Sequence, residues 1–88
     1  MLPDNHKFWN IVEEERFAEQ LRALHSDPVR ADEFVDGVKN ILCKDPMPLE
    51  ATKIGELVWF IPMRGSRVGV YYRFNEDYVY LLSIRVVD

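Results

Sequence analysis

The sequence is poor in cysteine and has no long apolar run, and each shortage excludes a class of protein. Cys43 is the single cysteine, so an internal disulfide and a CxxC zinc pattern are both excluded. A lone thiol is typical of a reducing compartment, and we therefore expect a cytoplasmic protein. The amino-terminal MLPDNHKF lacks the apolar run of a signal peptide, and the apolar run at residues 78–82, which no other run exceeds, is far shorter than a membrane span. We expect no membrane association.

Basic residues are also the minority. The chain has 11 Lys and Arg against 15 Asp and Glu, which gives a formal net charge of -4. An acidic chain does not attract nucleic acid through its overall field. The acids gather early, whereas four arginines lie in the last third, namely Arg64, Arg67, Arg73 and Arg85. A local basic patch therefore depends on whether folding brings these arginines together.

Apolar side chains are plentiful enough for one hydrophobic core. Hydrophobic residues make up 48% of the 88 residues, which is too many for a disordered chain. The sequence has no internal repeat, no low-complexity tract and no linker, so we expect a single domain over residues 1–88. The first 43 residues have helical periodicity and the last 34 have strand periodicity. This order predicts an α+β fold.

Two helices are predicted in the first half. Phe17, Leu21 and Leu24 recur at helical spacing after three glutamates that suit the positive end of a helix dipole. Asp27 before Pro28 is the pattern of an N-cap and a first helical position. The apolar period of this second helix then continues to the KDPMP stop through Ala31, Phe34, Val35, Val38, Ile41 and Leu42.

The helices are expected to form a hairpin, with the first helix packing close to Gly37 in the middle of the second. The preceding segment KFWNIV leaves two alternatives for residues 8–12. They form either a short separate strand that enters the helix near Glu13, or the start of the helix itself, since NIVE resembles a capping box.

The last third predicts an antiparallel meander of three strands. The three strands are ELVWFIPM, RVGVYYRF and residues 78–87. The turns between them are RGS and NED, and the preceding residues 47–55 are a loop. The third strand is apolar on both faces, which suits a central position. The predicted architecture is a helix hairpin on one face of this sheet, with the amino-terminal segment as a candidate fourth strand.

The alternation in RVGVYYRF predicts which strand residues face the helices. A three-residue turn would place Phe74 opposite Tyr78. The predicted pairs facing the helices are then Phe74–Tyr78, Tyr72–Tyr80, Val70–Leu82 and Val68–Ile84. Those on the other face are Arg73–Val79, Tyr71–Leu81, Gly69–Ser83 and Arg67–Arg85. Two arginines opposite each other repel, so an anion such as phosphate or carboxylate is expected between them.

These residues form the candidate anion- or partner-binding set: Arg64, Arg67, Arg73, Arg85 and Tyr71. The alternative is that Arg67 and Arg85 splay apart, or pair with Asp88, the terminal carboxylate or a glutamate of the first helix, and that Tyr71 only covers apolar surface. Exposed apolar area on this face predicts a partner, either another chain or a second copy.

Three segments resemble the RelE/ParE toxin superfamily, the toxin half of bacterial toxin–antitoxin pairs. ERFAEQLRAL is similar to its first helix, ADEFVDGVKNILCKDP to its second, and GSRVGVYYRFNEDYVYLLSI to its strand–turn–strand. The resemblance spans nearly the whole chain. It implies a toxin-like module, linked to plasmid stabilization, that acts by protein–protein contact and is neutralised by a cognate antitoxin.

By this resemblance, Arg67 falls on the arginine that contacts the scissile phosphate in members that cleave messenger RNA on the ribosome. Other nuclease positions are absent, because LVWFIP carries no basic residue and only VVD follows the last strand. The expectation therefore leans away from an enzyme and toward members like ParE, which act on DNA gyrase. The alternatives are a ribosome-dependent endoribonuclease using Arg64, Arg67 and Arg85, or a non-toxic homodimeric scaffold.

General acid–base catalysis lacks an evident base in this sequence. His6 and His25 are expected at the surface, Cys43 in the core, and Glu56 is a candidate base only if it faces the arginines. No metal-ligand spacing and no phosphate-binding glycine loop is present, so no metal and no cofactor are expected.

Overall fold

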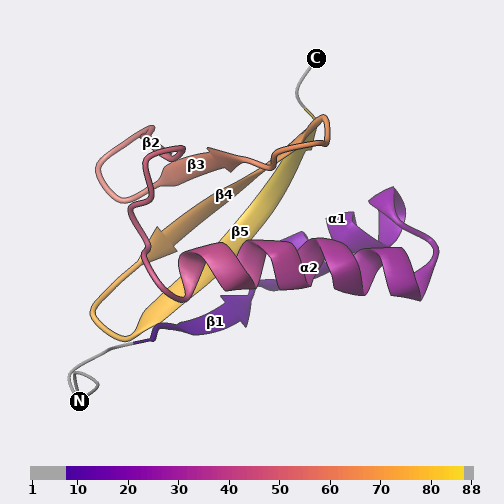
Figure 1. The fold of residues 1–88 in the computed structure, drawn as a ribbon, viewed down its shortest axis with the longest axis horizontal. Helices are drawn as coiled ribbons and strands as arrows, with labels where there is room; N and C mark the ends of the chain where they lie inside the picture. The colour runs from indigo at the N-terminus through magenta and orange to yellow at the C-terminus, as the bar shows by residue number, and fades with distance from the viewer. Residues whose placement is uncertain (1–7, 87–88) are drawn as a thin grey trace.

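The computed structural model describes residues 8–86, which form two helices on one face of a five-stranded sheet (Figure 1). The elements in chain order are β1 (Asn10–Glu13), α1 (Glu15–Leu24), α2 (Pro28–Leu42), β2 (Thr52–Lys53), β3 (Trp59–Pro62), β4 (Val68–Phe74) and β5 (Tyr78–Val86). The order across the sheet is β1-β5-β4-β3-β2, with β1 parallel to β5 and the other neighbours antiparallel. The α+β class and the β3–β4–β5 meander are confirmed, and β5 is central as predicted.

Two further strands flank the meander. The open question over residues 8–12 is settled in favour of a strand, because β1 pairs with the first half of β5. Trp9 anchors its start by donating its backbone N–H to Cys43 O at 2.8 Å. The segment predicted as a loop contains the two-residue strand β2, closed onto β3 by the Ile54 N–H, which donates to Val58 O at 2.8 Å.

The helix boundaries follow the predicted signals. The Asp27 carboxylate accepts a hydrogen bond from the Val29 N–H at 3.0 Å, and Pro28 occupies the first turn. This contact satisfies one of the N–H groups that a helix leaves unpaired at its start. α2 ends at Leu42, ahead of Pro46, as the KDPMP stop predicts.

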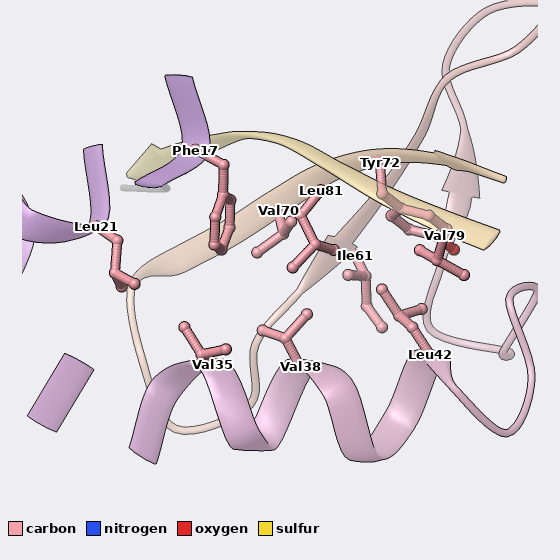
Figure 2. Close-up of a cluster of buried hydrophobic side chains, with 10 residues drawn as sticks. All are labelled: Phe17, Leu21, Val35, Val38, Leu42, Ile61, Val70, Tyr72, Val79 and Leu81. Atoms are coloured by element: carbon pink, nitrogen blue, oxygen red, sulfur yellow. The ribbon is translucent and has the colours of Figure 1, made fainter. Parts of the chain in front are cut away.

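The hydrophobic core lies between the helices and the sheet. Figure 2 shows side chains of α2 pointing toward the strands, with Phe17 and Leu21 of α1 beside them. The ten buried residues of this cluster are Phe17, Leu21, Val35, Val38, Leu42, Ile61, Val70, Tyr72, Val79 and Leu81. Two predicted core members deviate, since Ile41 is 38% exposed and Cys43, at the C-cap of α2, is only half-buried.

The expected close approach of α1 to Gly37 is wrong. A Cβ at Gly37 would lie nearest to Met63 Cε, 3.8 Å away, and Met63 belongs to the β3–β4 connection. That distance is an ordinary van der Waals contact, so the position tolerates a methyl group. The helices follow each other directly, and both contribute to the one core.

The β4–β5 hairpin is present, but its predicted register is wrong. Phe74 lies opposite Val79 rather than Tyr78. The cause is Asn75, whose side-chain oxygen accepts hydrogen bonds from the backbone N–H groups of Asp77 (2.9 Å) and Tyr78 (2.8 Å). Because of this turn, Tyr78 does not pair with β4, and the pairing of β5 with β4 is shifted by one residue. The residues at the start of β5 therefore face the side of the sheet opposite to the predicted one.

A β-bulge then restores the phase further along β5. The register shifts between Tyr71 and Tyr72, so that Tyr72 pairs with Leu81 and Tyr71 pairs with Ser83, and Leu82 is the extra residue. Beyond the bulge, Ile84 faces the helices as predicted. Arg85 lies on the other face as predicted, but opposite Gly69 instead of Arg67.

Candidate partner-binding face

The sheet surface away from the helices collects aromatic rings and arginines from three strands. The register places these side chains there because directly opposed residues share a face. We call this surface the aromatic–arginine face, and it consists of Phe60, Tyr71, Arg73, Tyr78, Tyr80 and Arg85. All six are at least partly exposed, with Tyr78 exposed by 41%. No helix among the described residues covers it (Figure 1).

One half of the face is organised by the Phe60 ring. It lies over Gly69, where a Cβ would overlap the ring, and its centroid is 4.9 Å from that of Tyr71. The Tyr71 hydroxyl in turn accepts a hydrogen bond from Arg85 Nη1 at 3.0 Å. The absent side chain of Gly69 therefore makes room for a ring that holds Tyr71, and Tyr71 orients the guanidinium of Arg85.

The other half is organised around Arg73. Its guanidinium carbon lies 4.1 Å from the centre of the Tyr80 ring, which is the geometry of a cation–π contact. It also forms a long ion pair, 3.9 Å, with Glu14 at the N-cap of α1. The Tyr78 and Tyr80 rings are 6.0 Å apart. Glu14 precedes α1, and neither Arg67 nor Arg85, for which a glutamate of the first helix was the alternative partner, pairs with a carboxylate of the described residues.

The remaining two arginines of the predicted set lie in the β3–β4 connection. Arg67 is exposed in the turn just before β4. Arg64 is exposed on the helix side of the sheet, where it lines a groove of about 250 Å³ together with Ile41, Glu50 and Ile61. The structure thus brings Arg73, Arg85 and Tyr71 onto one face and separates Arg64 from them.

Arg85 and Arg67 carry charge that no carboxylate neutralises within residues 8–86. Asp88 and the terminal carboxylate, which were the alternative partners, lie outside the described residues. A guanidinium fixed beside aromatic rings presents donors suited to carboxylate or phosphate, and the rings supply apolar contact area. The face is therefore suited to an acidic partner with apolar side chains.

The described residues do not assemble a set of groups for acid–base catalysis on this face. His25 is half-buried between the helices, with its ring 5.8 Å from that of Phe34. Glu56 is exposed in the β2–β3 turn. His6 lies outside the described residues. Within residues 8–86, no group of three or more His, Cys, Asp or Glu side chains is placed to hold a metal ion, and no helix is long and apolar enough to cross a membrane.

Tyr72 lies on the opposite side of β4 from Tyr71 and belongs to the core. Its hydroxyl donates to Pro46 O at 2.7 Å, which fastens the loop after α2 to the sheet. Burial raises the pKa of Tyr72 well above its ordinary value of 10.0, and the nearby charge of Asp45 raises it further. Of the two adjacent tyrosines, Tyr72 therefore stabilises the core, whereas Tyr71 contacts Arg85 at the surface.

Sequence reasoning missed Phe60, Tyr78 and Tyr80 as members of the face. The two tyrosines were assigned to the helix side because the register was displaced by one residue. The signal that could have placed them is Asn75, since an Asn at the start of a turn often accepts backbone N–H bonds from the residues that follow. Phe60 could have been found from Gly69, because a strand glycine often marks a close approach.

Comparison with known proteins gives a match in structure and none in sequence. No protein-family model and no curated protein sequence matches the chain. Its fold is similar to the crystal structure of the toxin–antitoxin complex RelBE2 from Mycobacterium tuberculosis, with a TM-score of 0.75 over 96% of this chain and 97% of that chain. The chain has a RelE-like toxin fold.

The likeness confirms the fold that the helix and strand motifs indicated. Only 15% of residues are identical, so the likeness establishes the fold and says nothing about individual side chains.

Proposed function

We propose that this protein is the toxin component of a bacterial toxin–antitoxin pair, located in the cytoplasm. In this proposal it acts by protein–protein contact, and a cognate antitoxin neutralises it by covering the aromatic–arginine face. The RelE-like fold supports a toxin-type role. The lone cysteine supports the compartment.

The observation that carries the proposal is the environment of Arg85. Its guanidinium is exposed, is hydrogen-bonded to Tyr71, and has no carboxylate partner in the described chain. Arginine and tyrosine side by side on a rigid sheet are the residue types that dominate the binding energy of protein interfaces. An acidic segment of a partner would neutralise the arginine, and its apolar side chains would cover the rings.

The same face argues for a protein target rather than RNA cleavage. Cleavage through a 2′-hydroxyl needs a base and an acid beside the groups that stabilise the phosphorane. The arginines supply charge, but neither His25 nor Glu56 makes a contact with them. DNA gyrase, on which ParE-like toxins act, is the target class that fits a toxin without nuclease residues.

Induced expression of the chain in a bacterium tests the proposal. We expect growth arrest, and we expect co-expression of the protein encoded by the neighbouring gene to restore growth. Tyr71→Ala and Arg85→Ala should each weaken that complex by about tenfold, since truncating an interface anchor typically costs more than 1 kcal/mol. Arg30→Ala, an exposed arginine on α2, is the matched control and should leave binding unchanged. Normal growth on induction would contradict the toxin role.

The second candidate is a ribosome-dependent messenger-RNA endoribonuclease. It is favoured by exposed Arg67 and by aromatic rings on which bases could stack. Purified chain added to translating ribosomes distinguishes the two. Efficient cleavage that Arg67→Ala abolishes would replace the protein-contact proposal with this one. A homodimer in sedimentation, together with normal growth on induction, would instead identify a non-toxic scaffold.

A further inference from the structure

A groove lies on the helix side of the sheet, between the last turns of α2 and the end of β3. We call it the α2–β3 groove. Its volume is about 250 Å³, and it is lined by Ile41, Glu50, Ile61, Pro62 and Arg64. Ile41 belongs to the apolar period of α2, yet it is 38% exposed, because no side chain of the described residues fills the groove above it. The apolar stripe of the helix is therefore left uncovered at this point.

The loop after α2 presents an apolar side chain next to this groove. The Ala51 N–H donates to Pro48 O at 3.0 Å and closes a β-turn with Leu49 and Glu50 at its central positions. Glu50 lines the groove, whereas Leu49 is 102% exposed and buries nothing against its own chain. Central turn positions usually carry polar residues or glycine and proline. An exposed leucine and an unfilled apolar groove thus occur on one surface.

The groove also carries one charge of each sign. Arg64 is held in a second β-turn, in which the Ser66 N–H donates to Met63 O at 3.2 Å and Gly65 has a φ of 81°. Arg64 and Glu50 line the same groove, but neither forms an ion pair within residues 8–86. A matching surface must therefore offer a carboxylate, a guanidinium and an apolar side chain.

The same surface of a second copy offers all three groups. In a two-fold interface, each contact occurs twice with the roles of the copies exchanged. Leu49 of one copy would enter the groove of the other, and Glu50, next to it in the turn, would then approach Arg64 of that other copy. The groove has room for the leucine, since a cavity of about 150 Å³ already holds a benzene molecule.

We propose that the α2–β3 groove is a two-fold interface between copies of this chain, in which Leu49 of each copy fills the groove of the other and Glu50 pairs with Arg64 across the interface. The proposal goes beyond the proposed function and does not rest on it. Because the groove lies on the helix side of the sheet, such a dimer leaves both aromatic–arginine faces open to other partners.

An acidic partner of the kind that suits the aromatic–arginine face fits this groove less well. Its carboxylates would neutralise Arg64 but would also lie beside Glu50, and like charges brought together at an interface oppose binding. The second copy instead meets each charge with its opposite. The charge pattern therefore favours self-association here over a uniformly acidic segment.

Sedimentation of the full chain over a concentration series up to millimolar tests the proposal. We expect a monomer–dimer equilibrium. Leu49→Asp should weaken it by about tenfold or more, as for other interface anchors, and should leave the melting temperature of the monomer unchanged. Leu57→Asp is the matched control, because Leu57 is 71% exposed in the β2–β3 turn, and it should leave the equilibrium unchanged. A monomeric wild type, or equal effects of the two variants, would overturn the proposal.

Charge reversal tests the pairing across the interface. Arg64→Glu and Glu50→Arg should each weaken the dimer by about tenfold, because each variant places like charges opposite each other twice. A mixture of the two variants should dimerise like the wild type, since every cross-pair is then of opposite sign. The double variant should dimerise equally well. A mixture that stays monomeric would show that these residues do not meet between copies.

Tyr71→Ala separates this interface from one on the aromatic–arginine face. It removes a ring on the other side of the sheet, so we expect the dimer to persist. If Tyr71→Ala abolished the dimer and Leu49→Asp preserved it, the copies would meet through the aromatic–arginine face and the groove interface would be wrong.

Discussion

Tyr72 shows how a single polar atom in the core fastens two distant segments. Its hydroxyl is buried with the side chain and donates to Pro46 O at 2.7 Å. Removing the donor would leave a buried carbonyl unpaired, which typically costs 1–3 kcal/mol. Burial also opposes ionisation, and the Asp45 charge adds to that effect.

The raised pKa of Tyr72 predicts a loss of stability at high pH. Below its ordinary pKa of 10.0, the hydroxyl is protonated in both the folded and unfolded states and contributes its full stabilisation. Above that pH the unfolded state ionises first, so the free energy of unfolding falls by about 1.4 kcal/mol per pH unit. Urea unfolding of Tyr72→Phe should show a loss of about 1–2 kcal/mol at pH 7 and a shallower decline above pH 10.

Tyr78→Phe is the control, because its side chain is 41% exposed. It should follow the wild-type curve at neutral pH. Parallel curves for wild type and Tyr72→Phe above pH 10 would show that Tyr72 does not set the alkaline limit.

At the scale of elements, β3 and β4 contact each other on the aromatic–arginine face, where the Phe60 ring packs over Gly69. A Cβ at Gly69 would overlap three atoms of that ring, although the glycine backbone itself is unstrained, since Gly65 is the single described residue with a positive φ. The glycine is therefore required for space and not for conformation. Losing it would displace the ring that supports Tyr71.

Gly69→Ala should destabilise the protein by about 1–3 kcal/mol, as expected for overpacking. Phe60→Leu removes the ring that blocks the methyl group, so the double variant should lose less than the sum of the single losses, by about 1 kcal/mol. Thermal unfolding of the four proteins measures this coupling. Gly55→Ala, where nothing lies within 4 Å, should change stability by less than about 0.5 kcal/mol. Additive losses would contradict the ring contact.

At the scale of the whole molecule, charge is unevenly distributed. The net charge is -4, and Arg67 and Arg85, like Arg16 and Arg30 of the helices, form no ion pair with a carboxylate of the described residues. Arg85 differs from the helix arginines in its contact with Tyr71 on the sheet. The overall field repels an acidic partner at long range, while the local field around Arg67 and Arg85 attracts it at short range. Specific binding then depends on contact with the arginines and not on steering.

This distribution predicts that the acidic protein binds an acidic polymer. Poly-L-glutamate should bind at low ionic strength and be released near physiological salt, where the screening length is about 8 Å. The pair Arg67→Gln and Arg85→Gln should abolish binding. The pair Arg16→Gln and Arg30→Gln, exposed arginines on the helices, changes net charge equally and should preserve it. Equal loss in both would show that only net charge matters.

The sequence by itself determined the periods of the main helix and strands and the cap and end of the second helix. The period of α2, its Asp27 cap and its end before Pro46 are local, and so is the alternation of β4. These signals sufficed for the α+β class and the order of the main elements, because helix and strand periods differ strongly. They also placed Tyr71, Arg73 and Arg85 on one face.

The tertiary structure alone decided how those elements meet. The Asn75 turn and the bulge near Leu82 set the register of β5, so they put Tyr78 and Tyr80 on the surface and Arg85 opposite Gly69. The parallel pairing of β1 and the contact of Gln20 with Ile84 join residues more than sixty positions apart. A one-residue change in a turn exchanges the faces of a strand at little local cost, and only packing against the helices selects the correct one.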